Sequence, residues 1–216
     1  MANVAILGFG TVGSGVAEVL TGHESSIARK ADGLVKLKYI LDVRDFPESP
    51  FADKFVKDFS VIEADPEVDI VVETIGGATV ALDFTRRALE AGKSVVTSNK
   101  ELVATHGYEL TQLARERGVC YLFEASVGGG IPIIRPLSQC LAANEILDIY
   151  GILNGTTNYI LTRMIRAGLS FEQALAEAQE KGYAERDPSA DVEGHDACRK
   201  ICILSAIAFG RHIYPE

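Results

Sequence analysis

The glycine-rich run Gly8-Phe9-Gly10-Thr11-Val12-Gly13 constrains this chain most strongly, because it directly follows the apolar residues 4–7 and precedes apolar residues at helical spacing. A G-x-G-x-x-G run between a buried strand and a helix is the fingerprint of dinucleotide-binding βαβ units. In such a unit Gly8 permits a tight turn, Gly10 lets a pyrophosphate approach the backbone, and Gly13 allows close helix–strand contact. The pyrophosphate then lies at the positive end of the helix. We therefore predict an NAD- or NADP-binding loop; an ordinary strand–helix turn is the weaker alternative.

Strand and helix patterns alternate along the first two-thirds of the chain. Short apolar runs predict strands at residues 4–7, 35–43, 69–75, 94–97 and 119–123. Periodic apolar spacing predicts helices after the glycine loop, at 79–91 and at 108–117, the last two ended by Gly92 and Gly118. Residues 46–60 contain Pro47 and Pro50 and are predicted to form a loop with room for one helical turn. The alternation favours an α/β fold with a Rossmann-type, doubly wound parallel sheet, assigned here to an NAD(P)-binding domain at residues 1–142.

The pattern changes after about residue 140. Residues 145–154 predict one strand, and residues 157–167, 170–181 and 194–209 predict helices. A buried strand without a neighbour leaves its backbone N–H and C=O groups unpaired. We therefore predict that residues 143–216 are part of an incomplete α+β catalytic domain, which further chain or another copy would complete.

Charge and composition exclude several classes of protein. Among 216 residues, 21 Lys and Arg stand against 30 Asp and Glu, a net charge of −9 that argues against nucleic-acid binding. The uncharged apolar run at residues 201–210 is too short to span a bilayer. The four cysteines form no C-x-x-C pair, and no secretory leader is visible at the N-terminus. These features predict a soluble, cytoplasmic protein with no membrane association.

The end of the second predicted strand bears on the choice between NAD and NADP. An acidic side chain there accepts hydrogen bonds from the ribose 2′-hydroxyl of NAD, whereas an arginine accommodates the 2′-phosphate of NADP. Asp42, Arg44 and Asp45 stand together at this position, so the residues leave both cofactors open.

A strongly charged segment precedes the last predicted helix. Asp196 and Lys200 are spaced i,i+4 and share a helix face, and the helix beyond Lys200 is almost wholly apolar. Together with Glu185 and Asp191, Asp196 completes a set of three carboxylates that suits the ammonium group of a ligand. The competing interpretation is surface decoration, because i,i+4 acid–base pairs are common on exposed helices.

Two smaller features also bear on the site. Asn99 and Lys100 follow the strand at 94–97, at the edge where open α/β sheets bind ligands. Cys198 and Cys202 are spaced i,i+4 near His195, but no second Cys/His cluster accompanies them, so we do not predict a zinc site.

Six motifs carry a resemblance to a known family. They are GFGTVG, VVETIGG, VVTSNK, FEASVGGGIPII, GILNGTTNYIL and GYAERDPSADVEGHDACRK, and they occur in the order seen in homoserine dehydrogenases. The last three are specific to that family, and the resemblance extends over nearly the whole chain. It implies NAD(P)-dependent interconversion of L-homoserine and L-aspartate 4-semialdehyde, a step toward threonine, methionine and isoleucine. It also implies a homodimer and a chain that continues well beyond residue 216.

The resemblance also assigns roles to matching residues. Lys200 corresponds to the catalytic lysine that exchanges a proton with the substrate oxygen, and Lys100 to a second lysine between nicotinamide and substrate. The residues that hold the substrate correspond to Glu185, Asp191, Asp196, Gly155 and Thr156. Cofactor contacts are expected from Gly8, Phe9, Gly10, Thr11, Val12, Gly13, Arg44, Thr74, Ile75, Gly76, Ser98, Asn99 and Lys100. A monovalent cation, plausibly sodium, is expected at Glu124, Val127, Gly129 and Ile131.

Two other functions stay open beside this one. One is a different Rossmann oxidoreductase acting on an amino acid, of the aspartate dehydrogenase type, which would share the first half but lack NGTTN and DVEGHDACRK. The other is a non-catalytic NAD(P)-binding module, which would bind the cofactor without transferring hydride.

Overall fold

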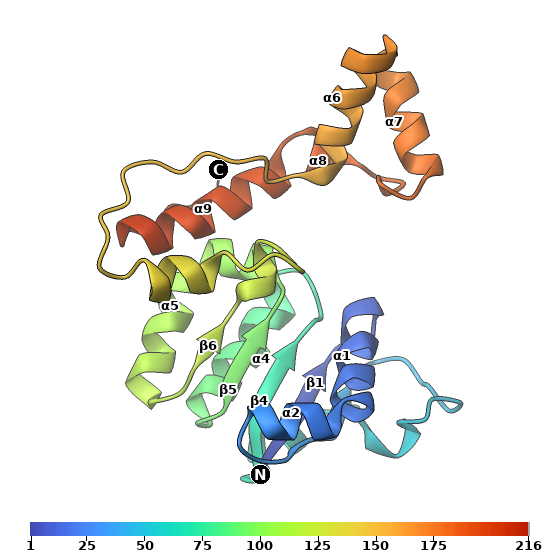
Figure 1. The fold of residues 1–216 in the computed structure, drawn as a ribbon. Helices are drawn as coiled ribbons and strands as arrows, with labels where there is room; N and C mark the ends of the chain where they lie inside the picture. The colour runs from blue at the N-terminus through green and yellow to red at the C-terminus, as the bar shows by residue number, and fades with distance from the viewer. Residues whose placement is uncertain (216) are drawn as a thin grey trace. The chain divides into compact units, whose positions relative to one another are not determined.

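Six parallel strands form the sheet of the first half of the chain (Figure 1). The structure is a computed structural model that describes residues 1–215. The strands are β1 (Ala2–Leu7), β2 (Val35–Leu41), β3 (Phe55–Val56), β4 (Val68–Glu73), β5 (Ser94–Thr97) and β6 (Tyr121–Leu122). Their order is β3-β2-β1-β4-β5-β6, so the chain reverses its direction of travel across the sheet at β1. This order confirms the predicted doubly wound, Rossmann-type sheet.

Helices lie on both faces of this sheet. They are α1 (Thr11–Gly22), α2 (Glu24–Lys30), α3 (Phe59–Ala64), α4 (Thr79–Glu90) and α5 (Lys100–Arg117). Helix α1 packs on β1 and β2, whereas α4 packs on β4 and β5. The crossover from β1 to β2 and the crossover from β4 to β5 run toward opposite edges of the sheet. Because crossovers between parallel strands are right-handed, α1 and α4 lie on opposite faces. The reversal leaves the carboxyl ends of β1 and β4 side by side at the ligand-binding edge.

Helix α5 begins earlier than its apolar pattern predicts. We expected residues 108–117, but the helix starts at Lys100 because the side chain of Asn99 caps it, accepting a hydrogen bond from Leu102 N at 3.1 Å. It ends at Gly118, whose φ of +68° is the left-handed conformation that glycine adopts readily, as predicted.

The segment 46–60 contains more regular structure than the sequence predicts. Instead of a loop with room for one turn, it contains a 3₁₀ turn (Ala52–Lys54) and the short strand β3, and α3 begins at its end. β3 pairs with the end of β2 and has only two residues, so its apolar run is too short to predict a strand from the sequence. Helix α2 was not predicted either.

The first compact unit comprises Met1–Ile133, and a second begins at Ile134. The helices of the second unit are α6 (Gly155–Ala167), α7 (Phe171–Glu180), α8 (Ser189–Val192) and α9 (His195–Phe209), preceded by a π-helical turn (Pro136–Cys140). The three long helices match the predicted ones within two residues at each end. Helices α6 and α7 pack together around a core of Ile160, Ala174, Ala178 and Ala184.

The predicted strand at 145–154 is wrong, since these residues are irregular. Tyr150 is 89% exposed and Ile152 77% exposed. Among the described residues of this unit there is no neighbouring strand whose backbone could pair with them. The apolar pattern of a strand is present, but the ladder that would order it is absent from this part of the chain.

An ion cluster ties α6 to α7 and gives a prediction about acid stability. Glu177 accepts hydrogen bonds from Lys181 Nζ at 2.5 Å, Arg163 Nε at 2.8 Å and Tyr159 OH at 2.8 Å. These donors, Lys181 foremost, lower the pKa of Glu177 to about 2. A carboxylate with a lowered pKa stabilises the fold above its ordinary pKa, and that contribution is lost as the pH falls toward the folded-state value.

We therefore expect the melting temperature of the chain to fall more steeply between about pH 4.5 and 2 than that of Glu177→Gln. The control is Glu180→Gln on the same helix, because the carboxylate of Glu180 is bonded to none of the described residues. Glu180→Gln should follow the pH dependence of the parent chain. Parallel curves for the parent chain and Glu177→Gln would contradict the role given to this cluster.

Candidate active site

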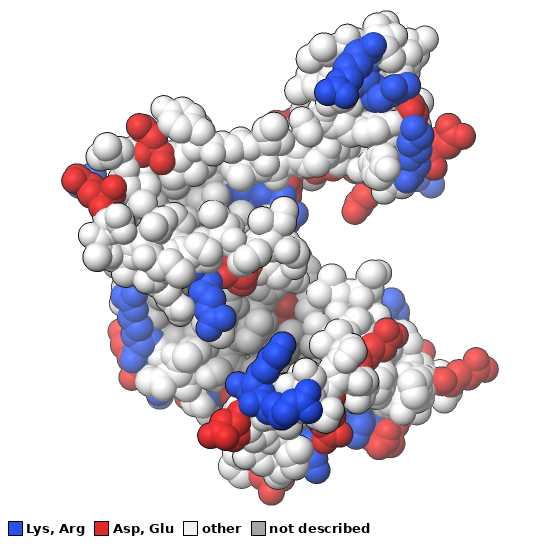
Figure 2. All heavy atoms as spheres, in the orientation of Figure 1, with Lys and Arg blue, Asp and Glu red and all other residues white. Residues whose placement is uncertain are grey.

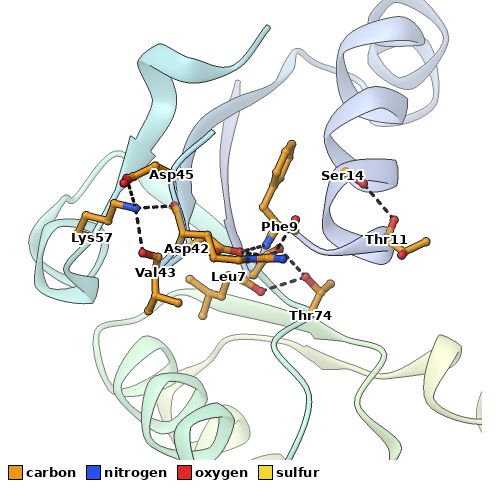
Figure 3. A network of polar contacts seen from close by, with 11 residues as sticks. Leu7, Phe9, Thr11, Ser14, Asp42, Val43, Asp45, Lys57 and Thr74 are labelled. Atoms are coloured by element: carbon orange, nitrogen blue, oxygen red, sulfur yellow. Dashed lines mark hydrogen bonds and ion pairs between the residues drawn. The ribbon is translucent and has the colours of Figure 1, made fainter. Parts of the chain in front are cut away.

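The glycine loop is fixed by close contacts between β1, α1 and β4, and Figure 3 shows the polar contact of Thr74 with Leu7 beside it. Gly8 has a φ of +92°, the tight turn predicted for it. A Cβ on Gly13 would lie 2.0 Å from Gly8 O, so the helix approaches the strand more closely than any side chain allows. Thr74, at the end of β4, donates its hydroxyl to Leu7 O at 3.0 Å and Gly8 O at 2.9 Å. Thr74 was predicted to contact the cofactor, and here it also holds the loop.

The N-terminus of α1 is open to an anion. Its N-cap residue, Gly10, is extended and offers no side chain to the first N–H groups of the helix, and no acidic residue stands in the first turn. A Cβ on Gly10 would meet nothing within 4 Å. Free N–H groups at a helix N-terminus attract phosphate through hydrogen bonds and the helix dipole. The residues of this loop therefore fit the pyrophosphate of a dinucleotide.

Gly13→Ala should destabilise the chain and abolish dinucleotide binding, since the new methyl group collides with backbone rather than with a movable side chain. Overpacking of this kind costs about 1–3 kcal/mol or more. The matched control is Gly15→Ala in the same helix, where a Cβ meets nothing within 4 Å and should stabilise the helix by up to about 1 kcal/mol. Urea unfolding and cofactor fluorescence titration measure both effects. Equal stability of the two variants would contradict the close contact.

Asp42, after the end of β2, is committed to protein contacts. Its Oδ2 accepts from Phe9 N at 2.7 Å and from an Arg44 guanidinium nitrogen at 2.9 Å, while Oδ1 accepts from Arg44 N at 2.9 Å and Nε at 3.0 Å. The Arg44 side chain, aided by these amides, holds the pKa of Asp42 well below its usual range. Four hydrogen bonds fill the acceptor capacity of a carboxylate. Asp42 thus serves to position Arg44, which is 59% exposed beside the glycine loop.

Lys57 is a residue of this region that the sequence did not reveal. It donates to Val43 O at 3.2 Å and pairs with Asp45 at 2.8 Å, next to Arg44 (Figure 3). The Arg44 guanidinium lies 5.1 Å from the centre of the Phe46 ring. Lys57 comes directly after β3, the strand that was not predicted, so its place beside Arg44 had no sequence signal.

A buried polar network joins the ends of β4 and β5. Glu73 is fully buried; its carboxylate accepts from Ile75 N at 2.8 Å and from Thr97 Oγ1 at 2.6 Å. Thr97 Oγ1 accepts from Asn99 N at 2.9 Å, and Asn99 Nδ2 donates to Gly77 O at 2.6 Å. The network brings the predicted residues Ile75, Gly76, Ser98 and Asn99 to one edge of the sheet, with Lys100 as the first residue of α5. Glu73, Thr97 and Gly77 are its unpredicted members.

In the second unit, Lys200 and the carboxylates meet around Asn154. Lys200 Nζ lies 2.8 Å from Asp196 Oδ2 and donates to Leu153 O at 2.8 Å. Asn154 Nδ2 donates to Asp191 Oδ1 at 2.7 Å and to Asp196 Oδ2 at 3.1 Å. The Asp196 side chain is 7% exposed and that of Lys200 15%. Asp196 is therefore buried and Lys200 largely so, which argues against surface decoration.

The other predicted substrate residues divide into two groups. Gly155 and Thr156 begin α6 directly after Asn154, and Thr156 Oγ1 donates to Tyr183 O at 2.8 Å. Glu185 is exposed, and its carboxylate is bonded to none of the described residues. The structure thus joins Asp191, Asp196 and Lys200 through the bonds of Asn154 and Asp196, whereas the Glu185 carboxylate stays exposed and makes no bond to them.

The predicted cation residues form a loop closed by Glu124. Its Oε1 accepts a hydrogen bond from Ile133 N at 2.6 Å, so the chain from 124 to 133 turns back on itself. Val127 is buried in this loop, whereas Ile131 is 74% exposed. One carboxylate with backbone carbonyls is an all-oxygen donor set, which suits a hard cation. Among residues 1–215, no three His, Cys, Asp or Glu side chains gather as metal ligands.

Charge on the surface is mixed. Figure 2 shows acidic and basic side chains interspersed, without a broad basic area on the face in view. None of the described helices has both the length and the apolarity that crossing a bilayer requires.

Comparisons with known proteins identify the family. A family model described as "Homoserine dehydrogenase, NAD binding domain" matches residues 8–124, more than half of the chain. The chain belongs to the homoserine dehydrogenase family. A second model, described as "Homoserine dehydrogenase", matches residues 132–216.

Individual homoserine dehydrogenases agree with this assignment. The one from Pseudomonas aeruginosa is 47% identical over 208 residues, covering 96% of this chain and 48% of that protein. The crystal structure of the Thiobacillus denitrificans enzyme is 44% identical with a TM-score of 0.90, covering 97% of this chain and 49% of that one. A hyperthermophilic archaeal homoserine dehydrogenase in complex with NADPH is 29% identical with a TM-score of 0.84, covering 98% and 70%.

The chain is shorter than the homoserine dehydrogenases it matches. The chain spans about half the length of the curated relatives it matches. Residues 8–124, with the glycine loop and the sheet edge, correspond to the NAD-binding domain of the family.

Proposed function

We propose that this chain supplies the cofactor domain and the catalytic lysine of an enzyme that interconverts L-homoserine and L-aspartate 4-semialdehyde, toward threonine, methionine and isoleucine. The observation that carries the proposal is the buried contact of Lys200 with Asp196, 2.8 Å apart, in a chain of the homoserine dehydrogenase family. In this proposal residues 1–142 serve the cofactor and residues 143–216 the substrate. The protein acts in the cytoplasm as a homodimer, as the family resemblance implies.

The roles of the residues follow from the chemistry. NAD(P), when bound, exchanges a hydride with the alcohol carbon of the substrate. Lys200 exchanges the proton of the substrate oxygen: its ammonium donates in the direction of alcohol formation, and its amine accepts in the reverse direction. Asp196 and Leu153 O fix the position of Lys200 Nζ. Lys100 corresponds to the family's second lysine, which would face the nicotinamide and the substrate when both are bound.

The substrate is held through its amino acid end. Asp191 and Glu185 bind its ammonium group by charge-assisted hydrogen bonds, and the backbone of Gly155 and Thr156 contacts the remainder. Fixing the substrate in this way brings the reacting carbon within reach of the hydride donor. In the first unit, Glu124 and the carbonyls of Val127, Gly129 and Ile131 would hold a sodium ion; the loop closed by Glu124 supports this assignment.

We further propose that the cofactor is NADP rather than NAD. Asp42 accepts four hydrogen bonds from Phe9 and Arg44, so it has no acceptor left for a ribose 2′-hydroxyl. The exposed Arg44 guanidinium lies beside the loop and suits a 2′-phosphate, and Lys57, paired with Asp45, donates to the backbone carbonyl of Arg44.

Product identification tests the proposed reaction. The protein at its full natural length, incubated with NADPH and L-aspartate 4-semialdehyde, should form L-homoserine detectable by mass spectrometry. Deuterium from 4-deuterated NADPH should appear at the carbon that carries the new hydroxyl. Oxidation of L-aspartate would instead support the aspartate dehydrogenase type, and cofactor binding with no product would support the non-catalytic module.

A further inference from the structure

Asn154 links three helices of the second unit. It is the N-cap residue of α6, it is 8% exposed, and it bonds to Asp191 in α8 and Asp196 in α9. The residue before it, Leu153, accepts a hydrogen bond from Lys200. Asn154 therefore adjoins both groups that fix the position of Lys200, the Asp196 carboxylate and the carbonyl of Leu153.

The orientation of the Asn154 amide is determined by the helix it caps. Its Oδ1 accepts from Thr157 N at 2.8 Å and from Thr157 Oγ1 at 2.9 Å. The oxygen thus faces the helix, and the NH₂ group must face the opposite way. Both of its hydrogens are then donated to carboxylates, at 2.7 Å to Asp191 and 3.1 Å to Asp196. An amide makes four hydrogen bonds at most, so Asn154 is fully used.

The oxygen that Asn154 holds on Asp196 is the one that Lys200 contacts. Asp196 Oδ2 accepts from Asn154 Nδ2 at 3.1 Å and lies 2.8 Å from Lys200 Nζ. Movement of this carboxylate would move the ammonium with it. The uncharged NH₂ group of Asn154 lies between the carboxylates of Asp191 and Asp196 and donates to both, so it bridges two negative charges.

We propose, on the basis of the function proposed above, that Asn154 is a positioning residue of the reaction. It holds Asp191 and Asp196 at fixed places, so that Asp196 aims Lys200 at the substrate oxygen and Asp191 stays available to the substrate ammonium. Capping α6 is the smaller part of its role. A cap needs only one acceptor, and Ser170 and Asp58 provide it at other helices of this chain.

This difference gives two discriminating variants. Asn154→Ser and Asn154→Asp both keep an acceptor for the α6 N-terminus, but both remove the two amide donors. In the protein at its full natural length, each should lower kcat by about 10- to 100-fold, the effect of misplacing a catalytic group. Asn154→Ser should melt near the parent, whereas Asn154→Asp should melt lower because its carboxylate repels those of Asp191 and Asp196. The control Ser170→Ala removes the cap of α7, and it should lower the melting temperature but leave kcat unchanged.

A pH readout separates positioning from structural support. Asn154→Asp places a third carboxylate beside Asp196 and so favours the ammonium form of Lys200. The rise of kcat/KM with pH in homoserine oxidation should then move to higher pH. The same shift should occur in acetylation of Lys200 by acetic anhydride, followed by peptide mass spectrometry, with the midpoint moving upward by about half to two pH units. Asn154→Ser adds no charge; because it releases Asp196 from its place beside Lys200, it should instead lower the midpoint.

The labelling experiment keeps the two proposals separate. If the parent protein does not oxidise homoserine, the proposed function fails, yet a shifted labelling midpoint in the uncharged variant Asn154→Ser still supports positioning of Lys200 by Asn154. If kcat stays within twofold of the parent and the midpoint of Lys200 is unchanged in Asn154→Ser, Asn154 is a helix cap alone and the inference is overturned.

Discussion

Lys200→Ala should lower kcat of the full-length protein by about 10²- to 10⁴-fold in both directions, the range that a positioned acid or base contributes. The dissociation constant of NADPH should stay within about twofold of the parent, because Lys200 and the glycine loop belong to different units. Steady-state kinetics and fluorescence titration of NADPH measure the two quantities. A loss confined to kcat would place Lys200 in the chemical step.

A matched substitution controls for the loss of a positive charge. Lys181→Ala also removes a lysine paired with a carboxylate of the same unit, at 2.5 Å from Glu177, but it lies in the α6–α7 ion cluster. It should lower stability and leave kcat near the parent value. Near-normal turnover in Lys200→Ala would remove this residue from the mechanism and with it the central part of the account.

Arg44→Ala should weaken NADPH binding by about 10- to 100-fold, since a hydrogen bond between charged groups contributes about 1.5–3 kcal/mol. The same change removes the two hydrogen bonds that the Arg44 guanidinium donates to Asp42. The third, from the backbone N–H of residue 44, is lost as well if the backbone shifts. A freed carboxylate can accept from the ribose 2′-hydroxyl of NADH. NADH binding should therefore stay unchanged or tighten, and the preference between the cofactors should decrease or reverse.

The control for this variant is Arg86→Ala. Arg86 is a surface arginine of the same unit that pairs with Glu109 at 3.0 Å, and its removal should affect neither cofactor. Calorimetric titration with NADPH and NADH gives the four dissociation constants needed. Equal weakening of both cofactors by Arg44→Ala would mean that Arg44 supports the loop through Phe9 O rather than reading the 2′-phosphate.

Most of the sheet could be predicted from the sequence, because five of its six strands are short, largely apolar runs that lie within a few residues of a glycine or proline. The exceptions have identifiable causes. The start of α5 is determined by the Asn99 side chain, which is polar and so interrupts the apolar pattern that was used to locate helices. β3 has too few residues to give a pattern. The strand at 145–154 has the right pattern, but a strand also needs a partner, and partners are not encoded locally.

The candidate site shows the same division between local and long-range information. The contact of Asp196 with Lys200 follows from i,i+4 spacing, and Gly8 and Gly13 follow from the fingerprint. Asn154 meets Asp196 across 42 positions of sequence, and spacing says nothing about such a contact. The same holds for Lys57 beside Arg44.

The most direct test of the account is the absorbance at 340 nm after L-homoserine is added to the full-length protein with NADP at alkaline pH. The account predicts a homoserine-dependent rise that is faster with NADP than with NAD. No rise with either cofactor, from protein whose NADPH binding has been verified by fluorescence, would contradict it.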